Sequence, residues 1–423
     1  MIELIQCKTD IGRKLESYKD FLPVDYRSCF KHGRILKGKK IMHVNATHKG
    51  GGVAELLATQ ISLERSMGID SRWFVMDAPD TFFRVTKKIH NMTQGLPGRL
   101  TMKEALTYLD TNQELSLPFL QILNTVKPDL VVIHDPQPMP LVKYVPAGIK
   151  TILRLHIDFS EPNPRITKFL TPFLSNYSRI IISSKNYIPE LPKNVQKRTT
   201  VIMPGIDPLS EKNRPMAREK ARIITKQLGI DPDRPIVLQV SRFDPWKDPL
   251  GVIEAYSMAK LEIQNLQLVL AGIIQAKDDP GARLILEKVK KRAGTDPDIF
   301  LFWDQSQINS NSVDCFVSAI LTASTVVIQK SIKEGFGLTI TEAMWKGKPV
   351  IGGNASGVRL QIINNRNGMI VSNTLMAAKA IIKLVRNPKL RNKLGKAARL
   401  SVQKRFLQPK YLLENLKVYK QVL

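Results

Sequence analysis

The sequence predicts an α/β protein made of two successive Rossmann-like domains that face each other across a cleft. Short β-branched runs alternate with helical patterns along the chain, an order typical of βα units that build parallel sheets. The alternation pauses over residues 203–213, where Pro, Gly and charged residues suit a linker, and then begins again. With 423 residues, 43% of them hydrophobic, the chain can fill the cores of two such domains.

Five runs predict the strands of a first domain over residues 1–205: Lys40–Val44, Arg72–Val75, Leu130–His134, Thr151–Leu155 and Arg179–Ile182. Six more predict those of a second domain over residues 206–404: Pro235–Val240, Leu266–Ala271, Ile299–Phe302, Thr325–Gln329, Pro349–Gly352 and Met369–Val371. The last stretch, 405–423, has helical spacing from about Pro409, and we expect it to pack back on the first domain. Doubly wound sheets bind ligands at the carboxyl ends of their strands, so we look for the chemistry there.

Charge and cysteine usage narrow the class of protein. Lys and Arg outnumber Asp and Glu by 64 to 37, an excess that attracts polyanions, anionic membranes or phosphorylated substrates without choosing among them. Between Lys383 and Leu423 there are twelve basic residues and one acid, which indicates either a solvated helix surface or contact with anionic lipid. The three cysteines lie far apart, so neither a disulfide framework nor a zinc site is indicated. This cysteine usage fits a reducing cytoplasm, and a soluble or peripheral protein is expected because no apolar run is long enough to span a bilayer.

The segment from Glu334 to Gly352 is the strongest functional signal. Gly335 and Gly337 would let the backbone approach a ligand, and a helix beginning near Leu338 would aim free N–H groups at an anion. Glu334 and Glu342 would be about 12 Å apart along a helix axis, wider than the roughly 5–9.5 Å of a glycosidase carboxylate pair. They are interpreted as groups that bind sugar hydroxyls; the alternative is a helix cap followed by a solvated helix face.

Two further segments suit phosphate groups. The predicted strand at Lys40–Val44 leads into Gly50, Gly51 and Gly52 and then a helix, which makes either a cradle of backbone amides or a plain tight turn. After the predicted strand at Pro235–Val240 come Arg242 and Lys247, whose guanidinium and ammonium groups suit a diphosphate. The alternative for this pair is two surface cations in a long loop.

Two histidines sit beside acids at the ends of neighbouring predicted strands. His134 precedes Asp135, and His156 lies two residues before Asp158. Neither pair has metal-ligand spacing or a nearby nucleophile, so hydrogen bonding to sugar hydroxyls is the preferred role over a structural one. The Asp-Pro-Asp triplets at 231–233 and 296–298 are read as turns that precede strands, not as a metal site.

Together these pieces resemble the retaining family 4 glycosyltransferases of the GT-B fold, and more narrowly the trehalose glycosyltransferring synthases. The matching segments follow in order over most of the chain: Gly50–Glu55, Phe82–Asn91, His134–Pro138, His156–Asp158, Ile206–Asn213, Ser241–Lys247 and Glu334–Gly352. The general family is indicated by Glu334, Glu342, Arg242 and Lys247. The trehalose subgroup is indicated by the Thr86–Asn91 and Asp207–Asn213 segments.

The resemblance implies a role for each matching residue. Arg242 and Lys247 would hold the nucleotide diphosphate, Glu334 the donor glucose, and His156 the donor sugar near the reacting carbon; these four are the predicted catalytic group. The remaining donor contacts are assigned to Gly51, Gly52, Glu342, Gly335, Phe336, Gly337 and Leu338. The acceptor contacts are assigned to Asp135, Lys88, His134 and Asp158.

Two segments depart from the family pattern. Paired glycines of the donor loop are replaced by Asn354–Val358, and an acidic glycine-containing turn by Asn364–Gly368. Because Ala355 and Ser356 do not adopt positive φ cheaply, the loop over the donor phosphate is expected to differ in shape. The segment Phe302–Cys315, where base recognition is expected, also matches poorly.

The predicted activity is reversible transfer of glucose from a nucleotide diphosphate glucose, UDP- or ADP-glucose, to glucose, giving trehalose with retention. The alternatives are a trehalose phosphorylase and a degenerate transferase scaffold that binds polyanions or membrane. No cofactor is required, and magnesium would be accommodated without a dedicated site. The expected partners are sugars and nucleotide sugars, with no specific nucleic acid; weak contact with an anionic membrane and a homodimer are allowed.

Overall fold

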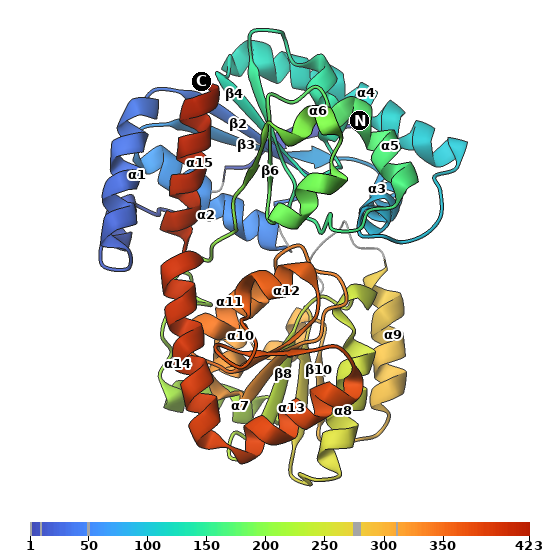
Figure 1. The fold of residues 1–423 in the computed structure, drawn as a ribbon, viewed down its shortest axis with the longest axis vertical. Helices are drawn as coiled ribbons and strands as arrows, with labels where there is room; N and C mark the ends of the chain where they lie inside the picture. The colour runs from blue at the N-terminus through green and yellow to red at the C-terminus, as the bar shows by residue number, and fades with distance from the viewer. Residues whose placement is uncertain (1, 9–10, 49–50, 274–280, 310–311) are drawn as a thin grey trace. The chain divides into compact units, whose positions relative to one another are not determined.

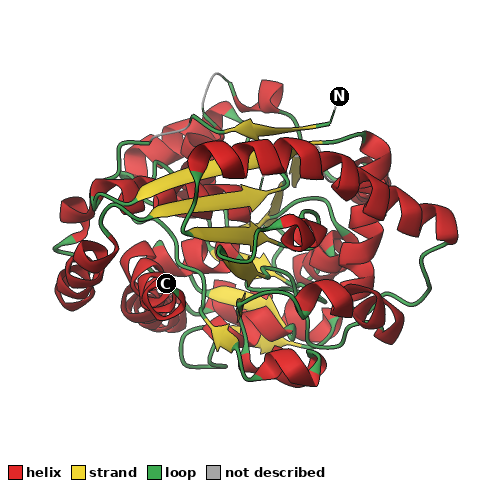
Figure 2. Cartoon of the chain, turned by 90° about the horizontal axis from the view of Figure 1, so that it is seen from above, coloured by secondary structure: helices red, strands yellow, loops and turns green. Residues whose placement is uncertain are grey.

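The computed structural model describes residues 2–8, 11–48, 51–273, 281–309 and 312–423. The described residues of 1–205 and 408–423 form one compact unit, and those of 206–275 and 281–407 form a second. Each unit has a largely parallel sheet with helices packed against it (Figure 1), and the strands lie among the helices when the chain is seen from above (Figure 2). The predicted fold class of two parallel-sheet α/β domains is therefore confirmed.

The first unit contains a seven-stranded sheet of order β1-β3-β2-β4-β5-β6-β7. All neighbouring strands are parallel except β1 and β3, which are antiparallel. The chain leaves β2 towards β3 on one side and leaves β4 towards β5 on the other, so the direction of winding reverses between β2 and β4. The strands are β1 (Glu3–Gln6), β2 (Lys40–Asn45), β3 (Asp70–Asp77), β4 (Leu130–His134), β5 (Lys150–Arg154), β6 (Arg179–Ile182) and β7 (Thr199–Val201).

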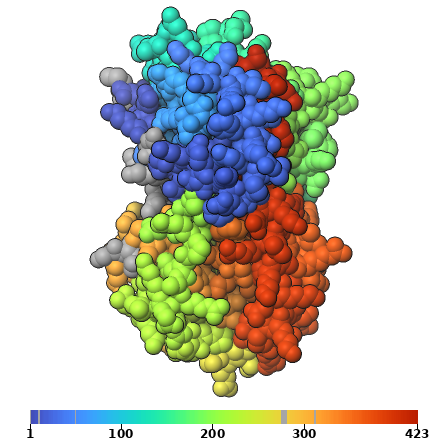
Figure 3. Space-filling model, turned by 90° about the vertical axis from the view of Figure 1, so that its left-hand side faces the viewer, coloured from blue at the N-terminus to red at the C-terminus, as the bar shows by residue number. Residues whose placement is uncertain are grey.

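The helices of the first unit include the last helix of the chain. They are α1 (Pro23–Leu36), α2 (Gly52–Ser66), α3 (Asp80–Thr93), α4 (Met102–Val126), α5 (Pro164–Leu174), α6 (Lys193–Gln196) and α15 (Gln408–Val422), with 3-10 turns at Leu15–Tyr18, Met139–Tyr144 and Lys185–Glu190. Helix α15 packs on α1 and α2 (Figure 1). Figure 3 shows this C-terminal segment, in red, at the surface beside the blue N-terminal helices. The Gln408 side chain donates to the carbonyl of Leu56 in α2 at 3.3 Å, which fixes the start of α15.

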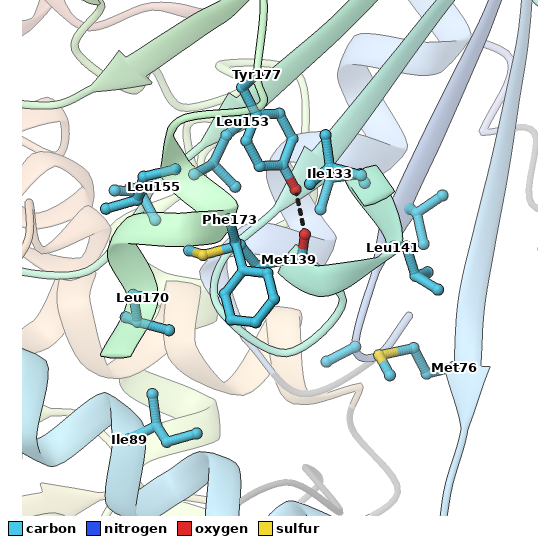
Figure 4. Close-up of a cluster of buried hydrophobic side chains, with 14 of the residues drawn as sticks. Met76, Ile89, Ile133, Met139, Leu141, Leu153, Leu155, Leu170, Phe173 and Tyr177 are labelled. Atoms are coloured by element: carbon cyan, nitrogen blue, oxygen red, sulfur yellow. Dashed lines mark hydrogen bonds between the residues drawn. The ribbon is translucent and has the colours of Figure 1, made fainter. Parts of the chain in front are cut away.

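One face of the first sheet is closed by a continuous apolar core. Side chains of the strands meet those of α3, α4 and α5, and all those labelled in Figure 4 are buried. The one polar group drawn bonding inside this cluster is satisfied: the Tyr177 hydroxyl donates to the carbonyl oxygen of Met139 at 2.7 Å. Leaving that carbonyl without a donor would cost about 1–3 kcal/mol, so this bond fixes the 3-10 turn after β4 against the strand β6 that follows Tyr177.

The second unit contains a six-stranded, fully parallel sheet of order β10-β9-β8-β11-β12-β13. From the centre of the sheet, β8, β9 and β10 follow one another towards one edge, and β11, β12 and β13 follow one another towards the other edge. The reversal, between β8 and β11, is the position where such sheets bind ligands. The strands are β8 (Ile236–Val240), β9 (Gln267–Ala271), β10 (Ile299–Phe302), β11 (Val326–Gln329), β12 (Val350–Gly353) and β13 (Met369–Val371).

Helices connect successive strands of this sheet, as in a doubly wound unit. They are α7 (Arg218–Gln227), α8 (Pro249–Lys260), α9 (Ala282–Ala293), α10 (Val313–Ala323), α11 (Leu338–Trp345), α12 (Ser356–Gln361), α13 (Thr374–Arg386) and α14 (Pro388–Arg405), with 3-10 turns at Pro245–Lys247 and Gln305–Ile308. No helix among the described residues is long and apolar enough to cross a membrane.

The predicted linker over 203–213 is wrong for most of its length. Residues from Ile206 onward are packed in the second unit, with Asp207, Lys212 and Asn213 all buried. The Trp345 indole N–H donates to the carbonyl of Asn213 at 3.1 Å, and this contact anchors the segment to α11. Pro, Gly and charge predict irregular backbone, but they do not distinguish a free linker from a packed loop.

Candidate active site

In the second unit, the loops after β8 and β11 are held together at the carboxyl edge of the sheet. The Lys247 ammonium lies 2.5 Å from a carboxylate oxygen of Glu334, and both side chains are largely buried. The backbone N–H of Ile332 donates to the carbonyl of Trp246 at 2.8 Å, so main chain as well as side chains join the two loops. Two residues 87 positions apart in the sequence thus meet because β8 and β11 are neighbours.

Lys247 is fixed by its own loop as well. The Asp244 carboxylate accepts from the N–H of Trp246 at 2.9 Å, and the Gln239 amide donates to the Lys247 carbonyl at 2.8 Å. The next residue, Asp248, has φ of 49°, accepts from the N–H of Gly251 and forms an ion pair with Lys330. Positive φ is costly for a residue other than glycine, and here it is retained by contacts on both sides. Arg242 lies in the same loop and is partly exposed.

The turn from Glu334 to α11 depends on two glycines. Gly337 has φ of 87°, a conformation that glycine adopts without steric cost, and α11 begins at Leu338 as the sequence predicts. Gly357, in the segment that departs from the family pattern, donates its N–H to the Glu334 carbonyl at 2.9 Å, and the Ser356 hydroxyl donates to the same oxygen at 3.2 Å. A Cβ at position 357 would lie 2.5 Å from that carbonyl oxygen. The segment therefore supports the backbone of Glu334 directly.

Glu342 is a buried helix residue. Its side chain is 2% exposed, and one carboxylate oxygen lies 2.8 Å from the ammonium of Lys212, whose side chain is 10% exposed. The alternative of a solvated helix face is thereby excluded for this glutamate. The cation comes from the packed 206–213 segment, so that segment supplies charge to the site as well as shape.

In the first unit, the predicted polar residues gather at the carboxyl ends of β4 and β5. One carboxylate oxygen of Asp135 accepts from the backbone N–H of His156 at 2.7 Å, which joins the two loops. Asp135 has φ of 64°, so its backbone is held in the left-handed region. The rings of His134 and His156 contact each other through nitrogen atoms 3.0 Å apart, and the carboxylate of the buried Asp158 accepts from the N–H of Ser160.

Both histidines are held neutral. Burial is the main cause that lowers the pKa of His134 well below 6.5, with smaller contributions from the charges of His156, His43 and Arg154. Burial and then the charge of Arg154 lower the pKa of His156 in the same direction. The Arg154 guanidinium is itself buried and donates to the carbonyls of Ile182 and Ile202.

Three predicted residues lie apart from these groups in the first unit. The Lys88 ammonium pairs with both carboxylate oxygens of Glu104 at 2.8 and 2.7 Å, linking α3 to the start of α4. Gly51 is the N-cap of α2, with extended backbone and open space where a side chain would be, and Gly52 begins the helix. Gly50 lies outside the described residues.

The structure also brings in residues that the sequence did not single out. Lys212 reaches Glu342, Asp248 and Lys330 brace the Lys247 loop, and His43 and Glu64 continue the contacts of His134 into the sheet. Lys212 lies in the Asp207–Asn213 segment, whose resemblance to the trehalose subgroup was the one sequence signal for it. His43 lies inside a predicted strand among apolar residues, and a buried polar side chain in such a position needs a hydrogen-bond partner. Within the part of the chain that the structure describes, no three His, Cys, Asp or Glu side chains gather as metal ligands.

Each half of the chain matches a known protein family. A family described as "Trehalose synthase, N-terminal domain" matches residues 43–189, and one described as "Glycosyl transferases group 1" matches residues 220–401. The chain is 38% identical to a trehalose synthase of Pyrococcus horikoshii over 95% of its own length and 94% of that protein. The chain belongs to the trehalose synthase family. It is a glycosyltransferase of the GT-B fold, as the sequence resemblance predicts.

Two further proteins are less similar in sequence to this trehalose synthase-like enzyme. A trehalose phosphorylase of Pleurotus pulmonarius is 26% identical over 87% of this chain but only 56% of its own length. Among solved structures, the Anabaena protein HepE, in complex with UDP and glucose, superposes with a TM-score of 0.66 at 16% identity, covering 90% of this chain and 100% of HepE. At that identity the likeness shows the fold.

The buried pair of Lys212 and Glu342 predicts a large effect on stability. Lys212→Met should lower the free energy of unfolding by about 3–5 kcal/mol, because a buried carboxylate loses its counter-charge. The double variant Lys212→Met, Glu342→Gln should recover most of that loss. Urea unfolding followed by circular dichroism measures both. A loss below about 1 kcal/mol in the single variant would show that the pair does not stabilise α11.

The neutral histidines predict a pH dependence with a defined sign. In the unfolded chain His134 and His156 bind protons below about pH 6.5, whereas in the fold their lowered pKa keeps them neutral. Stability should therefore be full above pH 6.5 and fall as the pH drops from 6.5 towards 5, by up to about 1.4 kcal/mol per pH unit for each histidine. Urea unfolding at several pH values measures the slope. A flat profile would contradict the burial argument.

Proposed function

We propose that this enzyme transfers glucose from a nucleotide diphosphate glucose to free glucose, forming α,α-trehalose reversibly and with retention. The observation that carries the proposal is the joining of the loops after β8 and β11, which sets Lys247 beside Glu334 at the winding reversal of the second sheet. Cations at that position suit a diphosphate, and a carboxylate suits sugar hydroxyls. The 38% identity to a trehalose synthase over nearly the full length of both proteins supports the choice of product.

The second unit is assigned to the donor. Arg242 can grip two phosphate oxygens at once, whereas Lys247 acts as a point charge. An ammonium group has three donors, so its bond to Glu334 orients Lys247 and still leaves donors for a phosphate. Glu334 would accept from the glucose hydroxyls, Glu342 from the ribose hydroxyls, and the Gly335–Leu338 turn would supply backbone contact. HepE, which shares the fold, was solved with UDP and glucose.

The polar edge of the first unit is assigned to the sugars. His156 would contact the donor glucose, and Asp135 and Asp158 would place the acceptor together with Lys88. Both ring nitrogens of His134 face other histidines, so His134, predicted to contact the acceptor, would act through His156 instead. As the glycosidic bond breaks, negative charge grows on the leaving phosphate, and preorganised cations stabilise that state more than the ground state. The leaving phosphate would then take the proton of the acceptor hydroxyl, which attacks from the same face and so retains the configuration.

The direct test is a transfer assay with the purified chain. With glucose and either UDP-glucose or ADP-glucose, we expect trehalose and the nucleoside diphosphate in equal amounts, and no trehalose when the nucleotide sugar is left out. Cleavage of trehalose by inorganic phosphate alone would replace the proposal with a phosphorylase. Absence of transfer, combined with salt-dependent binding to polyanions, would favour a scaffold that has lost the activity.

The two cations predict losses of different kinds. Lys247→Ala should lower turnover as well as donor affinity, at a cost of about 2–4 kcal/mol, or roughly 30- to 1,000-fold in rate. Arg242→Lys should behave like Arg242→Ala, because the bidentate geometry is lost. Steady-state kinetics with varied donor measures each. Lys288→Ala, on the exposed face of α9, serves as the control and should match the unaltered enzyme. Near-normal transfer by folded Lys247→Ala and Arg242→Ala variants would remove the diphosphate assignment.

A further inference from the structure

Four polar side chains form a diagonal row across the first sheet. Three of them lie on the neighbouring strands β3, β2 and β4, and the fourth, His156, lies two residues after the end of β5. Ser71 of β3 is paired in register with Ile41, two residues before His43 of β2. His43 is paired with Val132, two residues before His134 of β4, and His134 is paired with Arg154, two residues before His156. Since side chains two residues apart share a face of a sheet, each step moves one strand across and two residues towards the carboxyl edge.

Hydrogen bonds connect this row from the interior to the edge. The facing nitrogen atoms are Nδ1 of His43 and Nε2 of His134 at 3.2 Å, then Nδ1 of His134 and Nε2 of His156 at 3.0 Å. The ring centroids are 5.5 and 5.3 Å apart and the planes differ by 26° and 18°. The nitrogens are thus far closer than the centroids, so the rings meet edge to edge in nearly common planes, which suits hydrogen bonding.

Glu64 of α2 ends the row in the interior. Its carboxylate is fully buried and lies 3.2 Å from Nε2 of His43. The same carboxylate accepts from the Ser71 hydroxyl at 2.6 Å and from the Gln60 amide at 2.7 Å, and the Tyr419 hydroxyl of α15 accepts from that amide at 2.9 Å. A carboxylate surrounded by donors acts as an acceptor only, so His43 must offer its Nε2–H to it.

That one requirement sets the direction of every later bond. A His43 ring whose single proton is on Nε2 has a bare Nδ1, which can only accept, so His134 then carries its proton on Nε2. The same logic applied to the next contact places the proton of His156 on Nε2. Charged groups that face the row from neighbouring elements are Arg154 of β5 and Asp135 after β4; the first disfavours protonation of both outer histidines.

We infer that Glu64, acting through His43 and His134, fixes His156 as the Nε2–H tautomer and so presents its Nδ1 lone pair to the substrate. The inference deepens the proposed function, in which His156 contacts the donor glucose, and therefore rests on it. Glu64 and His43 are positioning residues that do not touch the sugar. A bare Nδ1 accepts from a sugar hydroxyl, whereas the other tautomer would meet that hydroxyl with a donor. The Ser-His-Asp triad uses a buried carboxylate for the same purpose.

The first test needs no substitution. Two-bond proton–nitrogen correlation spectra of the protein with 15N-labelled histidine rings separate protonated from bare ring nitrogens, and the His156→Gln variant identifies the signal of His156. We expect His134 and His156 each to occur as the Nε2–H tautomer alone. A proton on Nδ1 of His156 would overturn the inference, whether or not the enzyme makes trehalose.

The second test removes the charge that sets the direction. In Glu64→Gln the side chain keeps its shape but can donate as well as accept, so His156 should become a mixture of tautomers, and turnover should fall about tenfold or more. Tyr177→Phe is the matched control: it loses a buried hydrogen bond of the same unit, outside the row, and should keep both the tautomer and the turnover.

Each outcome of the second test decides one claim. A single, unchanged tautomer in Glu64→Gln would overturn the relay from Glu64, and an altered tautomer with unchanged turnover would overturn its role in the reaction. If the unaltered enzyme forms no trehalose, the proposed function fails, while the spectra still decide whether Glu64 sets the tautomer of His156.

Discussion

Parallel pairing of β8 with β11 is the constraint on which the polar edge of the second unit depends. Because the winding reverses between them, the chain leaves the two strands in opposite directions, and the loops that follow lie side by side at the carboxyl edge. Lys247 and Glu334 meet there. The ion pair of Asp248 with Lys330 and the backbone around it hold the two loops in place. The charged pair is therefore a product of topology first and of side-chain chemistry second.

Much of this arrangement follows from local sequence patterns. The strand at Leu130–His134 has the predicted bounds, and so does the one at Met369–Val371, because both are apolar runs flanked by turn residues. The two strands missed, β1 and β7, are short edge strands with little burial: β1 buries only Leu4, and β7 has no fully buried residue. Hydrophobic periodicity is weak in such strands, and their pairing is decided by the neighbouring strand.

Sequence patterns indicated which polar residues lie near the strand ends, but not which contacts they make. Strand ends and glycines indicated Arg242, Lys247, Glu334 and His156 from sequence, although their roles stay proposals. The pairing of Glu342 with Lys212, or of Glu64 with His43, depends on which face of a helix meets which face of a sheet. Side-chain spacing along one segment carries no information on its partner in another, and neither does it reveal the left-handed backbone of Asp135.

Gly357 bears on how the donor loop of this chain can vary during evolution. Ala355 has an ordinary φ of −73° and Ser356 begins a helix, so neither position needs glycine. At 357 the backbone of Glu334, Gly335 and Phe336 fills the space that a side chain would take. The backbone at 355 and 356 thus accepts residues other than glycine, within the limits of a buried position and of the bond from the Ser356 hydroxyl to Glu334, whereas position 357 is confined to glycine. In this chain the loop therefore carries side chains at 355 and 356 and requires glycine at 357.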